Sequence, residues 1–114
     1  MKLKDVAKVV PLTVEAAEGK LDKQVTGGYV GDLLSHVMAK AQPGDIWITV
    51  QAHPNVVAVA VVAGLSGVVV TEGTVIDPMT IQKAEEEGVP MFSTPLSSFA
   101  TVAALAKAGI NGTR

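Results

Sequence analysis

The longest uncharged stretch of the chain lies in its middle, between Asp45 and Glu72. Apolar runs at 46–50 and 68–70 are typical of buried strands. Between them, a polar step at 51–55 is followed by a continuous apolar run at 56–63 and a glycine turn at 64–67. Because two parallel strands need a crossover that is usually helical, this order predicts a strand–helix–strand unit.

The predicted helix over 54–63 is rich in valine, a residue that favours strands. Its two ends favour a helix nevertheless. Pro54 suits the first helical position, where its missing N–H costs nothing, and Gly64 suits a left-handed helix end. A strand over the same residues is the alternative that the sequence leaves open.

Apolar periodicity predicts further elements toward the N-terminus. We expect a helix over 1–10, a strand over 12–16 and a shorter strand over 21–26. The glycine-rich segment 26–32 is expected to lead into a helix that ends near residue 41. The apolar face of that helix comprises Leu33, Leu34, Val37, Met38 and Ala41.

Toward the C-terminus, two more helices flank a short strand over 91–93. Asp77 and Pro78 predict the start of the first helix, because aspartate caps helices and proline fits their first turn. The second helix is expected to begin at Thr94-Pro95. Its predicted core face comprises Leu96, Phe99, Val102, Ala103 and Ala106.

The second half of the chain is thus predicted to be β-α-β-α-β-α. The predicted fold class is a three-layer α/β fold, with a parallel-cored or mixed sheet flanked by helices, and residues 1–114 are expected to form a single domain. The 9 Lys and Arg residues are scattered and the net charge is −2, so nucleic-acid binding is not expected. The chain has no Cys and only two His, and we expect neither a metal nor another cofactor. A charged start and the lack of a long apolar segment indicate a cytoplasmic protein outside the membrane.

Polar side chains follow the strands of the predicted parallel sheet. Ligands of such sheets bind beside the carboxyl ends of the strands, where free N–H groups at helix starts suit an anion. A simpler interpretation is that these residues only cap helices, and that the glycines form a tight turn without the lysine of a Walker A loop. The candidate ligand site comprises His53, Asn55, Thr71, Gly73, Thr94 and Ser97, joined by Gly27 and Gly28.

Three segments together resemble a stand-alone DRTGG-domain protein: VTGGYVGDLLSHVM at 25–38, WITVQAHPNVVAVA at 47–60 and STPLSSF at 93–99. Thr26-Gly27-Gly28 matches the end of the name motif, with Gln24-Val25 in place of Asp-Arg. The resemblance implies a fold similar to the N-terminal domain of HPr kinase/phosphorylase and a tendency to self-associate. It also implies a regulatory role, because such domains accompany CBS-domain pairs and some phosphotransacetylases, and small stand-alone members are often encoded beside iron-only hydrogenase and related redox genes.

We therefore predict a non-catalytic regulatory or ligand-sensing domain that binds a small anionic ligand or nucleotide, a partner protein such as a redox enzyme, or both. The alternative is a small enzyme for a phosphorylated or carboxylated metabolite, with His53 as acid/base beside Glu72 or Asp77. A homodimer is expected, because the helix over 54–63 has no polar face, unless neighbouring helices of the same chain cover it.

Overall fold

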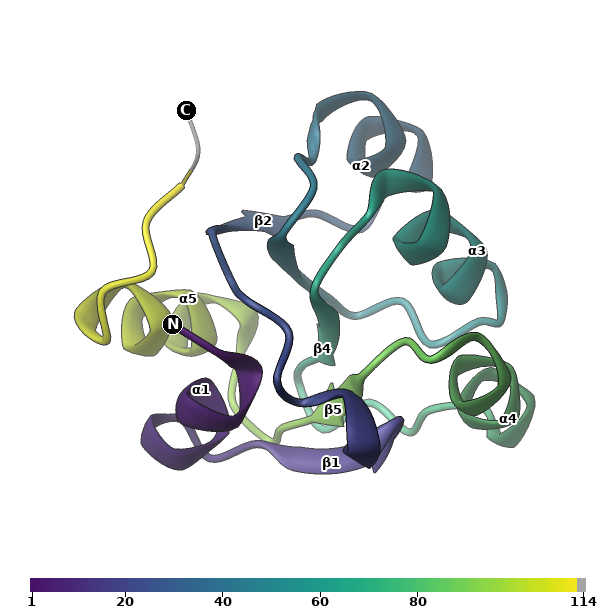
Figure 1. Ribbon diagram of the computed structural model, residues 1–114, viewed down its shortest axis with the longest axis horizontal. Coiled ribbons are helices and arrows are strands. Elements are labelled where there is room, and N and C mark those ends of the chain that lie inside the picture. Colours follow the sequence, from purple (N-terminus) through teal and green to yellow (C-terminus); the bar gives the residue numbers. More distant parts are fainter. Residues whose placement is uncertain (113–114) are drawn as a thin grey trace.

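The computed structural model describes residues 1–112 and shows a five-stranded sheet between two layers of helices (Figure 1). The sheet order is β1-β5-β4-β3-β2, with β1 antiparallel to β5 and the other pairs parallel. This arrangement confirms the predicted α/β fold. The strands are β1 (Thr13–Ala16), β2 (Gly27–Val30), β3 (Asp45–Thr49), β4 (Gly67–Val70) and β5 (Met91–Ser93). The helices are α1 (Leu3–Val9), the 3-10 helix η1 (Glu18–Lys20), α2 (Leu34–Lys40), α3 (Asn55–Ala63), α4 (Pro78–Glu87) and α5 (Ser98–Lys107).

The order of the parallel strands decides which face each helix covers. From β2 to β5 the chain always moves to the next strand on the same side, so right-handed crossovers place α2, α3 and α4 on one face. The helices α1 and α5 cover the other face (Figure 1). Each face has its own core, one around Trp47 and Val57 and the other around Leu3, Ile48 and Phe92.

The helix predicted over 54–63 is confirmed as α3, in spite of its valines. Gly64 ends it in the left-handed region at φ 68°, as expected, and Pro54 occupies the N-cap, one position before the first turn. The sheet and the neighbouring helices bury Val57 and Ala60, whereas Val61 and Val62 stay 48% and 70% exposed. The tertiary need for a crossover between parallel strands therefore outweighs the strand propensity of valine.

The strand predicted over 21–26 is wrong. Apart from a single antiparallel bridge between Lys2 and Gln24, that segment is irregular, and the strand is the glycine-rich β2. Gly28 pairs with Ile46 and packs close to Ile110, because a β-carbon on Gly28 would lie 3.7 Å from the Ile110 Cγ2 atom. Glycine has low strand propensity, so the composition of this segment did not predict a strand. Glycine is tolerated here because other residues pack close to the strand's backbone.

The predicted face of α2 is correct at Val37 and Ala41, which are buried, and wrong at two other positions. Leu33 precedes the helix as its N-cap and is 57% exposed, and Met38 is 45% exposed. The helix is only 7 residues long, so it buries a narrower set of side chains than the wide apolar face that the periodicity predicted.

The start and the face of α5 also differ from the prediction. The helix begins after Thr94-Pro95, with Ser97 as N-cap, and it buries Thr101 and Leu105. The Thr101 hydroxyl donates to the Ser97 carbonyl at 2.8 Å, so burial leaves no hydroxyl unpaired. Four residues of the predicted core face are exposed instead: Phe99, Val102, Ala103 and Ala106. Among residues 1–112, no helix is both long and apolar enough to cross a membrane.

Candidate functional site

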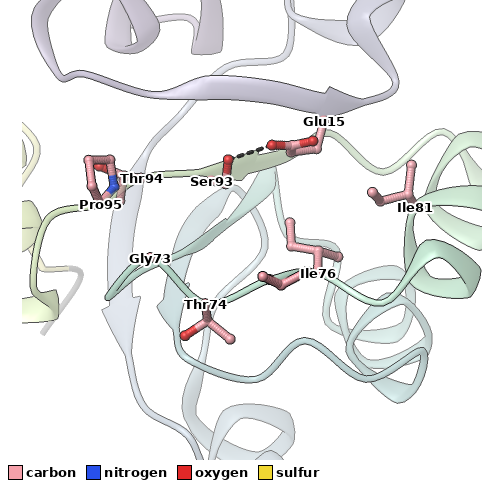
Figure 2. Close-up of a pocket in the computed structure, with 9 residues that line it drawn as sticks. Glu15, Gly73, Thr74, Ile76, Ile81, Ser93, Thr94 and Pro95 are labelled. Atoms are coloured by element: carbon pink, nitrogen blue, oxygen red, sulfur yellow. Dashed lines mark hydrogen bonds between the residues drawn. The ribbon is translucent and has the colours of Figure 1, made fainter.

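A cavity opens where two neighbouring strands send their helices to opposite faces of the sheet. β4 leads to α4 and β5 leads to α5, so the two loops diverge at the carboxyl edge of the sheet. Such a point is where ligands bind in open α/β sheets. The cavity has a volume of about 400 Å³ (Figure 2). Its lining comprises Gly73, Thr74, Val75 and Ile76 after β4, Ser93, Thr94 and Pro95 at the end of β5, Glu15 of β1 and Ile81 of α4.

The backbone that leads from β4 to this cavity is held by hydrogen bonds. Glu72 and Gly73 both have left-handed conformations, with φ of 64° and 66°. Their N–H groups donate across the gap, Glu72 to the Leu96 carbonyl at 2.7 Å and Gly73 to the Thr94 carbonyl at 3.0 Å. The left-handed conformation costs a non-glycine residue about 1–2 kcal/mol. The Glu72 carboxylate offsets part of this cost by accepting a hydrogen bond from the Ser98 N–H at 2.9 Å.

One wall of the cavity is polar and the opposite wall is apolar. On the polar side, the Ser93 hydroxyl donates to the Glu15 Oε2 atom at 2.5 Å (Figure 2). On the apolar side, Ile76 and Ile81 project from the β4–α4 loop and from α4. Within residues 1–112, ion pairs up to 4.0 Å join only Lys2 and Lys4 to Asp22, so no cation neutralises Glu15.

The helices that begin at this edge are capped by the chain itself. Asp77 caps α4, as predicted, by accepting from the Met79 N–H at 2.9 Å. Ser97 caps α5 by accepting from the Ala100 N–H at 3.0 Å. His53 Nδ1 accepts from the Asn55 N–H at 3.2 Å. An anion at these helix starts would therefore compete with side chains that already occupy the donors.

Basic side chains lie at the opposite edge of the sheet. The Lys23 ammonium donates to the Gly88 carbonyl, which precedes β5, at 3.1 Å. Partial burial lowers the pKa of Lys23, and the nearby charge of Lys20 lowers it further. No Lys or Arg of the described residues lines the cavity beside Glu15. Among the described residues, the lining of the cavity thus contains a carboxylate and no basic side chain.

The structure brings only part of the predicted ligand site together. Gly73 and Thr94 line the cavity. His53 and Asn55 are exposed at the start of α3, and Asn55 borders a different depression, between α3 and α4. Whether any of these four residues binds a ligand stays a prediction.

The remaining predicted residues have other surroundings. Thr71 is fully buried, with its Oγ1 atom 2.6 Å from Ser98 Oγ, and Ser97 is used as the cap of α5. Gly27 and Gly28 pair with the first residues of β3, Asp45 and Ile46, so the structure does not bring them to the cavity, and a role of theirs in ligand binding stays a prediction. Strand starts lie at the edge of a parallel sheet opposite to the strand ends, so the sheet separates the two sets.

The structure does not pair His53 with either carboxylate that the predicted alternative, a small enzyme, would use. Among residues 1–112, His53 makes neither a hydrogen bond nor an ion pair with Glu72 or Asp77. Both carboxylates accept from backbone N–H groups instead. The same part of the chain contains no group of three His, Cys, Asp or Glu side chains that could hold a metal ion.

Sequence reasoning missed the side chain that gives the cavity its charge. Glu15 lies in β1, the only antiparallel strand among the described residues, and it meets Ser93 across 78 positions of sequence. A single carboxylate inside the strand predicted over 12–16 was the available signal. The position of β1 beside β5, which turns that carboxylate toward the carboxyl edge, is set by the tertiary fold.

Comparison with known proteins gives one family and one fold. The model of the DRTGG domain matches residues 5–108. A similar solved structure contains the CBS and DRTGG domains of the regulatory region of Clostridium perfringens pyrophosphatase, complexed with its activator diadenosine tetraphosphate. The TM-score is 0.73 at 17% identity, over 90% of this chain and 45% of that chain. At this identity the likeness concerns the fold, and this chain spans less than half of the length of the other. No curated protein matches the chain.

Proposed function

This chain belongs to the DRTGG domain family, and we propose on that basis that it is a non-catalytic regulatory domain that senses a small ligand. The observation that carries the proposal is the cavity between the diverging β4 and β5 loops. Its position follows the general rule for ligand sites in open α/β sheets. The described residues around it offer hydroxyls, a carboxylate and apolar walls, without an assembled nucleophile and base.

A nucleotide is the ligand class that we favour. The structure with a similar fold comes from a regulatory region that was solved with a dinucleoside polyphosphate activator. A volume of about 400 Å³ lies within the range of small-molecule sites, roughly 300–1,000 Å³. The cavity therefore has room for part of a nucleotide, with the remainder in solvent.

Thermal unfolding with a panel of ligands tests this function. We expect at least one of AMP, ADP, ATP and diadenosine tetraphosphate to raise the midpoint of unfolding. A ligand at 100 times its dissociation constant adds about 2.7 kcal/mol to the free energy of unfolding. Inorganic phosphate at the same ionic strength is the control. If no nucleotide shifts the midpoint at millimolar concentration, the proposed nucleotide sensor is wrong.

We also propose that the domain acts as a cytoplasmic homodimer that contacts itself through α3. Three small or branched apolar side chains of this helix face outward, Ala58, Val61 and Val62. Lys83 and Glu87 of α4 border the same patch. Because a two-fold contact presents the same patch from both copies, it could set Lys83 of one copy beside Glu87 of the other. A redox-enzyme partner stays a prediction, to be tested by co-purification with the tagged domain.

A further inference from the structure

The cavity between the β4 and β5 loops combines two kinds of surface that point to one class of ligand. Ile76, Ile81 and Pro95 provide apolar area, which suits an uncharged ring. Glu15 and Ser93 provide oxygen atoms on the side of the sheet, and Thr74 provides a hydroxyl from the β4–α4 loop. Sites for small molecules typically have such mainly apolar walls with a few placed polar groups.

The charge of the lining argues against a phosphate inside this cavity. The only charged side chain in the lining is the carboxylate of Glu15, and no Lys or Arg among residues 1–112 lines it. The neighbouring starts of α4 and α5 already have acceptors in Asp77 and Ser97. A phosphate here would meet a negative charge without a cation to balance it, which opposes binding.

The partly exposed Glu15 carboxylate has acceptor positions that a ligand could use. It has two oxygens with about four acceptor positions. Among the described residues, the only donor to it is the Ser93 hydroxyl. Two adjacent hydroxyls of a ribose are donors with the right spacing for one carboxylate, and acidic side chains bind ribose hydroxyls in dinucleotide sites.

We propose that this cavity binds the nucleoside part of a nucleotide, with Glu15 accepting hydrogen bonds from the ribose hydroxyls and the base against Ile76 and Ile81. The phosphates of the ligand point to solvent. The inference rests on the proposed nucleotide sensor and names the part of the ligand that is recognised. It has a consequence that a phosphate-binding site would not have, since removal of all phosphates leaves binding intact.

Calorimetric titration with adenosine, 2′-deoxyadenosine, AMP and ATP tests this assignment. Adenosine is expected to bind at least as tightly as ATP. Loss of the 2′-hydroxyl should weaken binding about tenfold or more, since hydrogen bonds to a charged group are the strong ones. In Glu15→Gln the difference between adenosine and 2′-deoxyadenosine should shrink to about threefold or less. Glu18→Gln removes the same charge from an exposed residue that lies three positions after Glu15 and outside the lining, and it should leave all four affinities unchanged.

Amide NMR shifts of the unmodified protein keep the test valid if Glu15→Gln does not fold. Adenosine should shift Gly73, Thr74 and Ser93 and leave Gly28 at the opposite edge in place. Affinity that rises with each phosphate, or shifts outside the cavity, would overturn the assignment while the nucleotide sensor stands. Tighter binding of putrescine than of adenosine would also overturn it, because the carboxylate would then select an ammonium. If neither nucleosides nor nucleotides bind, the assignment and the proposed function both fail.

Discussion

At the scale of the residue, Gly44 shows how closely the turns of this chain are packed. It has φ +88°, and a β-carbon at this position would lie 2.2 Å from the Thr26 Oγ1 atom and 3.3 Å from Thr26 Cβ. We expect Gly44→Ala to lower the free energy of unfolding by about 2–4 kcal/mol, because the unfavourable backbone conformation adds to the steric clash. Urea denaturation measures the change.

Two companion variants separate these causes. Gly73 has φ +66°, and a β-carbon added there would have nothing within 4 Å, so Gly73→Ala should cost only the backbone part, about 1–2 kcal/mol. Thr26→Ala removes the clashing hydroxyl, and in that background Gly44→Ala should cost less than in the wild type. Equal costs of Gly44→Ala in both backgrounds would contradict the steric explanation.

Residues with a purely local role were the predictable ones. Asp77 caps α4 and Gly64 ends α3 because their own backbone and side-chain chemistry suits those positions. Glu15 and Thr101 were not predictable in this way. The first has its role through a partner in β5. The second is buried because the rest of the chain packs on that face of α5, and its hydrogen bond to the Ser97 carbonyl makes this burial tolerable.

At the scale of the element, the residue that caps α5 differs between the prediction and the structure, and this difference can be tested. Ser97, rather than Thr94, supplies the capping oxygen to the Ala100 N–H. We expect Ser97→Ala to lower the free energy of unfolding by about 1 kcal/mol, the usual value of an N-cap. Chemical denaturation followed by circular dichroism is the measurement.

Ser97→Asn is the matched control for that cap. Asparagine keeps an oxygen that accepts from the same N–H group, so its stability should be within about 0.5 kcal/mol of the wild type. If alanine and asparagine are equally destabilising at this position, the loss comes from packing and the cap makes no contribution.

Sequence-based prediction was more accurate for some helices than for others. For α3 the ends and the need for a crossover were decisive, and the prediction is confirmed. In α5, apolar residues lie on most sides of the helix, so periodicity alone could not select the face. The predicted face was aligned on Leu96, which precedes the helix, and the residues Phe99 and Val102 were placed inside while the structure exposes them.

At the scale of the whole molecule, the exposed side of α3 predicts self-association. Val62 is 70% exposed and Ala58 lies beside it on the patch bordered by Lys83 and Glu87. We expect the wild type to sediment as a dimer at tens of micromolar, and Ala58→Glu and Val62→Glu to sediment as folded monomers, because the contact would remove water from the added carboxylates.

Val9→Glu is the control for the added charge. Val9 is 58% exposed on α1, which covers the opposite face of the sheet, so this variant should stay dimeric. A monomeric wild type would end the proposal. A dimer that persists in both α3 variants would place the contact elsewhere on the surface.

The sequence predicted the β-α-β-α-β-α half of the chain, and in the structure each crossover of that half sets the next strand beside the last. The location of β1 did not follow, because an N-terminal strand can join either edge of such a sheet. The cavity is bordered by that strand. The predicted residues Gly73 and Thr94 line this cavity, whereas the sequence did not indicate Glu15, and whether any of them binds a ligand stays a prediction.

The pairing of β1 with β5 has a consequence for the order of folding. From β2 to β5, each strand pairs with the strand that follows it in the sequence. The contact between Glu15 and Ser93, in contrast, joins residues 78 positions apart. Because closing so long a loop is entropically costly, we expect β1 to dock after the parallel strands have paired. A ligand that contacts Glu15 together with the β4 and β5 loops would hold the N-terminal segment that ends with β1 against the rest of the sheet. Ligand binding would then slow the release of that segment from the sheet. Another protein could detect this change without contacting the ligand.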